Sequence, residues 1–93
     1  MKMTKSQIRE MFWHEVNGLE RPEEVCTKRY ALEGLCYENP KEIVYMTVII
    51  DWKKDFGDLG NPSPDNWFEP VILSALIMDE MDEIILDITS IVK

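Results

Sequence analysis

The sequence predicts an α+β fold, in which an amino-terminal amphipathic helix packs on a small antiparallel β-sheet of three to five strands. Three observations lead to this prediction. Apolar residues recur at helical spacing over 5–17, residues 42–52 are rich in β-branched side chains, and two further apolar runs of strand length lie near the carboxyl end. A chain of 93 residues is expected to form one compact domain over 1–93.

The first element is predicted to be a helix over 5–17. Thr4 and Gln7 have the spacing of a capping box, in which each side chain accepts a hydrogen bond from the other residue's backbone N–H. Asn17 and Gly18 predict a left-handed stop at the other end. The apolar stripe needs a surface to bury against, and it consists of Ile8, Met11, Phe12, Val16 and Leu19.

The segment after this helix is ambiguous. Pro22 is followed by two glutamates, which is typical of a helix start. The apolar residues over 27–37 also fit a strand, with Gly34 as its weak point. We favour the strand, which a turn over 38–41 would join to the next strand as a hairpin.

Residues 42–52 form the most distinct strand of the sequence. Side chains alternate between the two faces of a strand, so the residues of each face can be named in advance. One face is mixed and consists of Tyr45, Thr47, Ile49 and Asp51. The other is wholly apolar and is expected to meet the helix; it consists of Val44, Met46, Val48, Ile50 and Trp52.

The rest of the chain is predicted to contain a long loop and two strands. The loop covers 53–66, where two glycines and two prolines interrupt any hydrophobic period. The strands cover 71–78 and 84–92 and are joined by an acidic turn over 79–83. A helix over 80–92 fits the same apolar residues and is the alternative.

Charge limits the classes of partner. The chain has 10 basic and 18 acidic side chains, for a net charge of −8. Residues 1–30 carry six basic and five acidic side chains, whereas residues 31–93 carry four and thirteen. Such a surface repels nucleic acid and anionic lipid and attracts basic surfaces, although solubility alone also explains it. We expect no direct nucleic-acid or membrane partner and, without a signal or spanning segment, a cytoplasmic location.

No arrangement of residues predicts catalysis. His14 is the single histidine, and Cys26 and Cys36 are too far apart for paired zinc ligands. We therefore predict no catalytic residue, no metal and no cofactor, and reduced cysteines, with a disulfide as the alternative if they lie on neighbouring strands. The loop aspartates fail the spacing of an EF-hand, which leaves a carboxylate-based metal-binding enzyme as an unfavoured hypothesis.

Recognition of another protein remains as the favoured function. We predict a small, acidic, non-enzymatic protein-binding domain, with an edge strand that favours a homodimer. The alternative is an inhibitor of a host defence nuclease, of the anti-CRISPR or anti-restriction type made by phages and mobile elements, whose carboxylates mimic nucleic acid. For the tryptophans, the alternative role is closure of the core. The candidate contact residues are Trp52, Asp55, Asp58, Trp67, Asp79, Glu80, Asp82 and Glu83.

Overall fold

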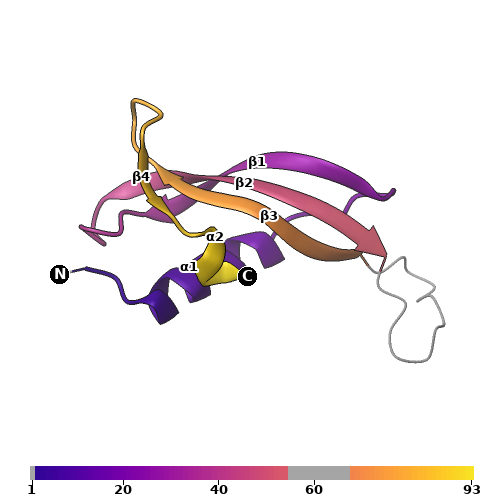
Figure 1. Cartoon of the computed structure of the whole chain (residues 1–93), viewed down its shortest axis with the longest axis horizontal. Helices are drawn as coiled ribbons and strands as arrows, with labels where there is room; N and C mark the ends of the chain where they lie inside the picture. The colour runs from indigo at the N-terminus through magenta and orange to yellow at the C-terminus, as the bar shows by residue number, and fades with distance from the viewer. Residues whose placement is uncertain (1, 55–67) are drawn as a thin grey trace.

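A computed structural model describes residues 2–54 and 68–93 of the chain (Figure 1). The predicted α+β fold, with an amino-terminal helix on an antiparallel sheet, is confirmed: the sheet has four strands. The elements of the described residues are α1 (Lys5–Asn17), β1 (Cys26–Leu35), β2 (Ile43–Lys54), β3 (Phe68–Met78), β4 (Ile84–Asp87) and α2 (Thr89–Val92).

The strands follow one another across the sheet in the order β1-β2-β3-β4, and each pair of neighbours is antiparallel. This meander places the β1–β2 turn and the β3–β4 turn at the same end of the sheet. Strand β2 ends, and β3 begins, at the opposite end (Figure 1). The two turns, which are far apart in the sequence, therefore lie at the same end of the fold.

One face of the sheet is covered by both helices, and no described element covers the other face (Figure 1). The apolar face predicted for β2 is buried throughout, and it shares one core with Ile8, Phe12 and Val16 of α1. Burying each such side chain stabilises the fold by about 1.5–3 kcal/mol. Two side chains of α1 also bond α2: Arg9 Nε donates to the Ile91 carbonyl at 3.0 Å, and Trp13 Nε1 to that of Val92 at 3.1 Å.

Helix α1 has the predicted bounds and the predicted capping box. Thr4 Oγ1 accepts from the Gln7 N–H at 3.2 Å, and Gln7 Oε1 accepts from the Thr4 N–H at 2.8 Å. The left-handed stop is wrong, because Gly18 has φ −81° and ψ −8°. The helix ends instead in a tightened turn, in which the Gly18 N–H donates to the Glu15 carbonyl at 3.2 Å.

Strand β1 settles the ambiguous segment in favour of the predicted strand, and the alternative, a helix starting at Pro22, is wrong. The strand runs from residue 26 to 35 rather than from 27 to 37. Its alternate residues Leu32 and Gly34 face the core. A Cβ atom on Gly34 would lie 2.9 Å from Met46 Cγ, so any larger residue here would force the Met46 side chain to shift.

The predicted hairpin turn between β1 and β2 is present. Asn39 organises it: its carbonyl accepts from the Glu42 N–H at 2.9 Å, and its Oδ1 accepts from the Lys41 N–H at 3.3 Å. The Cys36 N–H closes the hairpin on the Glu42 carbonyl at 2.9 Å.

The carboxyl-terminal prediction needs correction. The strand over 71–78 is present and begins earlier, at Phe68, but the strand expected over 84–92 ends at Asp87. The alternative helix over 80–92 is also wrong except for the last turn, α2. Ile88 and Val92, one helical turn apart, are both buried in the core.

Thr89 explains why β4 stops where it does. Its Oγ1 accepts from the Ala75 N–H at 3.0 Å and donates to the Ala75 carbonyl at 3.2 Å, which also accepts from the Ile88 N–H at 3.0 Å. The Thr89 hydroxyl therefore takes the place of a β4 carbonyl as the acceptor of the Ala75 N–H. Hydrogen bonds from Thr89, first its side chain and then its backbone N–H, hold the pKa of Asp87 below its usual 3.8.

The two cysteines lie at the two ends of β1. Cys26 opens the strand and Cys36 directly follows it, and both are free thiols. Ten residues of extended chain separate their Cα atoms by roughly 33 Å, which rules out a disulfide within the chain.

Candidate functional site

Three of the eight predicted contact residues lie outside the described residues. They are Asp55, Asp58 and Trp67, and most of the predicted loop 53–66 lies there too. The loop was predicted to begin at Lys53, but β2 continues through Lys54.

Trp52 is described, and it belongs to the core. Only 1% of the residue is exposed, and its Nε1 donates to the Tyr30 hydroxyl at 2.9 Å. The Tyr30 ring meets it edge-on with centroids 6.5 Å apart, and the Arg21 guanidinium lies 5.7 Å from the Trp52 ring centre. Trp52 therefore closes the core, which is the alternative role stated above for the tryptophans. A partner cannot reach Trp52 in this fold, so we leave it out of the candidate site.

The other four predicted residues form the turn between β3 and β4, and Asp79 organises it. Asp79 Oδ1 accepts from the N–H groups of Met81 and Glu83, both at 2.9 Å. The Asp79 N–H donates to the Glu83 carbonyl at 2.9 Å, and Asp82 adopts φ 60°, a left-handed conformation that aspartate tolerates. Asp79 therefore contributes to the shape of the turn as well as to its charge.

Asp82 connects the turn to the sheet. The Tyr45 hydroxyl, on the uncovered face of β2, donates to Asp82 Oδ1. That hydrogen bond is the main cause that raises the pKa of Tyr45 above its usual 10.0, and desolvation and the charges of Asp82 and Asp79 act in the same direction. The sequence contains no local signal for this contact, because the two residues are 37 positions apart.

Glu80 and Glu83 have no such structural role. Both are exposed, and within residues 2–54 and 68–93 neither side chain forms an ion pair or a hydrogen bond. Their carboxylates are therefore available to a partner.

The topology adds carboxylates that the sequence analysis missed. The β1–β2 turn lies at the same end of the sheet and carries Glu38 and Glu42, both exposed, with Lys41 between them. Only the meander order could have revealed this, since each turn by itself reads as an ordinary polar loop. We call the carboxylates of the two turns the acidic end: Glu38, Glu42, Asp79, Glu80, Asp82 and Glu83.

Exposed apolar side chains lie beside the acidic end. Within the described residues, five large apolar residues are exposed, and three of them are at this end: Ile43 at 64%, Met81 at 82% and Ile84 at 58%. Ile84 pairs with Met78, and Met78 pairs with Tyr45. The side chains of Tyr45, Met78 and Ile84 therefore form one row across the uncovered face. The end thus combines free negative charge with apolar surface.

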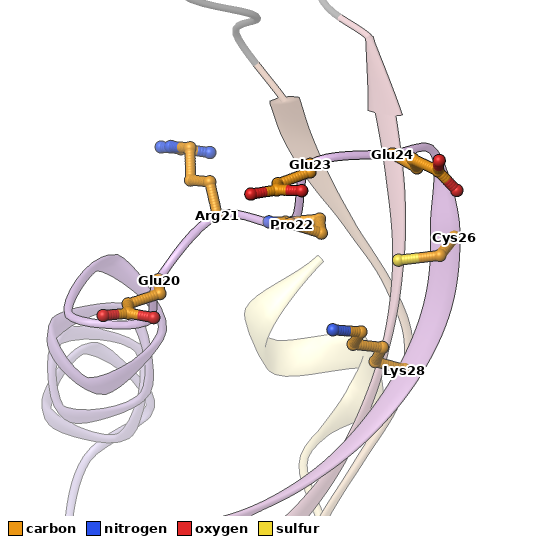
Figure 2. Close-up of a pocket in the computed structure, with 7 residues that line it drawn as sticks. All are labelled: Glu20, Arg21, Pro22, Glu23, Glu24, Cys26 and Lys28. Atoms are coloured by element: carbon orange, nitrogen blue, oxygen red, sulfur yellow. The ribbon is translucent and has the colours of Figure 1, made fainter.

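A hollow at the opposite end has a different character. It encloses about 500 Å³ between the segment 20–24 and the start of β1, and Lys28 and Cys26 line it from the strand (Figure 2). In Figure 2 the Glu20 and Glu24 side chains do not point toward each other. Its charges are of both signs and its lining is mostly exposed, so it offers no convergent set of groups for a substrate.

The described residues lack two further features. No group of three or more histidine, cysteine, aspartate or glutamate side chains is placed to hold a metal ion there. No helix of that part of the chain is long and apolar enough to cross a membrane.

Comparison with known proteins finds no match to a family model, a curated protein or a solved structure. The acidic end is therefore interpreted from its own chemistry.

Proposed function

We propose that this chain is a small, non-enzymatic protein-binding domain whose acidic end binds a partner with a basic and partly apolar surface. One observation supports this proposal above the others: the free carboxylates of two turns flank the exposed side chains of Ile43, Met81 and Ile84. Protein interfaces combine an apolar centre with a polar rim in the same way.

The two kinds of side chain would contribute differently. The carboxylates attract a basic partner during approach and favour one orientation, and that effect weakens as salt screens the charges. The apolar side chains contribute affinity, at about 1.5–3 kcal/mol for each one fully buried. The Asp79 and Asp82 hydrogen bonds hold the turn in one shape before binding, which lowers the entropy lost on association.

A nucleic-acid mimic acting on a host nuclease would present the same carboxylates to a basic groove. Mimicry of phosphates requires charge alone, however, and it gives no reason for the exposed Met81 and Ile84. A partner with a mixed surface explains both features, and so we prefer it.

Affinity capture from the source cell's lysate, with elution by a salt gradient, tests the proposal. Neutralising all four turn carboxylates would also remove the hydrogen bonds of Asp79 and Asp82, so the informative variant is Glu80→Gln with Glu83→Gln. The control is Glu23→Gln with Glu24→Gln, an equal charge change on exposed residues near the opposite end. We expect the control to retain a partner that wild type captures and the turn variant to lose it. Equal capture by both variants would contradict the proposal.

The cytoplasmic location is part of the same proposal. Cys26 and Cys36 are free thiols, which suits a reducing compartment. A second copy of the chain, paired through an edge strand, is the other partner expected from the sequence.

A further inference from the structure

The two edges of the sheet differ in how well they resist pairing with another strand. On one side, β4 has only four residues, and the part of β3 beyond it contains Pro70 and a bulge at Leu73. Short strands, proline and bulges are the usual protections of a sheet edge. On the other side, β1 has ten residues, no proline, and an unbroken register with β2. Its outer edge can accept a strand from Cys26 to Glu33, whereas the Leu35 N–H already donates to Met11 Sδ of α1 at 3.0 Å.

Two opposite charges on β1 do not pair with each other in the described part of the chain. Arg29 and Glu33 are both exposed, and their register with Ile49 and Tyr45 places them on the uncovered face. They are four residues apart on an extended strand, so their Cα atoms are roughly 13 Å apart. In the described part of the chain neither forms an ion pair.

We propose that β1 pairs antiparallel with β1 of a second copy, about a two-fold axis at Ala31. In this register Arg29 lies opposite the partner's Glu33, and Glu33 lies opposite the partner's Arg29. Each charge that is unpaired in the monomer gains an opposite charge in a directly facing position, the arrangement that stabilises neighbouring strands. Ala31, small and exposed, meets its own copy at the axis.

Neighbouring registers lack this match. An axis at Arg29 or at Glu33 would oppose two like charges, which is destabilising. An axis at Tyr30 would place Arg29 opposite the partner's Ala31, and an axis at Leu32 would place Arg29 opposite the partner's Leu35. Only the axis at Ala31 pairs both charges with their opposites.

The helix-side face of β1 fits the same register. Tyr30, half-buried, lies opposite the partner's Leu32. Lys28, which is exposed, lies opposite the partner's Gly34, where there is no side chain to obstruct it. Large residues therefore meet smaller ones on this face.

The distribution of charge also favours β1 as the contact. Two copies with a net charge of −8 each repel one another at long range. Residues 26–32 contain Lys28 and Arg29 and no carboxylate, whereas the 79–83 turn lies on the far side of the sheet beside β4. Pairing through β1 brings together the least acidic edges. It leaves the 79–83 turn of each copy at an outer side of the eight-stranded sheet. This inference is independent of the proposed function.

Charge reversal tests the register. We expect Arg29→Glu or Glu33→Arg alone to weaken the dimer about tenfold to a hundredfold, because each makes two attractive pairs repulsive. The double variant Arg29→Glu with Glu33→Arg restores both pairs and should return the dissociation constant to the wild-type range. Sedimentation equilibrium measures the constant, and circular dichroism checks that each variant, altered only at exposed residues, retains the fold.

Lys28→Glu is the matched control, because it makes the same charge change on the adjacent residue, which faces glycine. It should weaken the dimer far less than Arg29→Glu. Hydrogen exchange on wild type needs no variant: protection of β1 amides should increase with protein concentration. A wild-type chain that stays monomeric to about 1 mM, a double variant that folds but does not dimerise, or an equal effect of Lys28→Glu would overturn the proposal.

Discussion

Tyr45 and Asp82 show how much the acidic end depends on single side chains. Asp82 takes a left-handed backbone conformation, and its carboxylate accepts the hydrogen bond from the Tyr45 hydroxyl on β2. The bond requires the phenol to keep its proton. The turn is therefore coupled to the ionisation of one tyrosine.

The raised pKa of Tyr45 predicts an effect at alkaline pH. The folded state favours the neutral phenol, so this stabilisation is fully present below the usual pKa of 10.0 and is lost as pH rises through the higher folded value. Absorbance titration of wild type should show a tyrosine that ionises above pH 10.0, and Tyr45→Phe should remove that step. Asp82→Asn should lower the pKa of Tyr45 toward the usual value. A titration curve that Tyr45→Phe leaves unchanged at high pH would be inconsistent with the contact.

Two glycines offer a matched comparison of packing. At Gly34, a Cβ would lie 2.9 Å from Met46 Cγ in the buried core, and overpacking of this kind costs about 1–3 kcal/mol. At Gly18, the nearest atom is the Glu15 carbonyl oxygen at 3.5 Å, an ordinary contact, and φ is negative. Gly34→Ala should lower the free energy of unfolding in urea, whereas Gly18→Ala should leave it unchanged or raise it by about 0.4–1 kcal/mol. If the two alanine substitutions changed the free energy of unfolding equally, the Met46 side chain would move aside freely.

At the scale of elements, the end of β4 is decided by a contact across the sheet. Thr89 bonds both backbone groups of Ala75, and the chain then turns into α2, which buries Val92. The β-branched run over 84–92 favours a strand along its whole length. No local pattern indicates that the Thr89 hydroxyl, rather than a β4 carbonyl, accepts from the Ala75 N–H.

Thr89 can be tested by two conservative substitutions. Thr89→Val keeps the shape but leaves the Ala75 N–H without its acceptor, while the Ala75 carbonyl keeps its bond from the Ile88 N–H. We expect a loss of about 1–3 kcal/mol in the free energy of unfolding. Thr89→Ser keeps the hydroxyl, so it should lower the free energy of unfolding by less than Thr89→Val. Urea denaturation measures both variants, and a valine variant as stable as the serine variant would contradict this role of the hydroxyl.

What the sequence could predict follows from the distance over which each contact acts. The α1 capping box is formed by residues three apart, and the β2 faces follow from simple alternation, so both were predictable. Strand β1 was ambiguous because its pattern gains meaning only when Leu32 and Gly34 pair with β2. The turn over 79–83 was predicted as acidic, but its contact with Tyr45 and its place at the same end of the sheet as Glu38 and Glu42 depend on strand order. The burial of Trp52 depends on Tyr30, 22 residues away.

At the scale of the whole molecule, charge and apolar surface are unevenly placed. Both turns at one end carry carboxylates, and three of the five exposed large apolar residues of the described chain are beside them. The edge strand β1 carries the two charges, Arg29 and Glu33, that a second copy could match. A dimer joined through β1 would present two acidic ends, so a partner with repeated sites would bind it with greater avidity.

The chemical-shift footprint of the captured partner on this protein tests the central claim most directly. We predict that amide shifts change over the turns 38–42 and 79–84, while the segment 20–25 at the other end remains unaffected. Met81→Ser with Ile84→Ser should weaken binding, and Val25→Ser, an exposed apolar residue of the other end, should not. A footprint that avoids both turns, with affinity unchanged by the Met81 and Ile84 substitutions, would contradict the assignment of the acidic end as the binding surface.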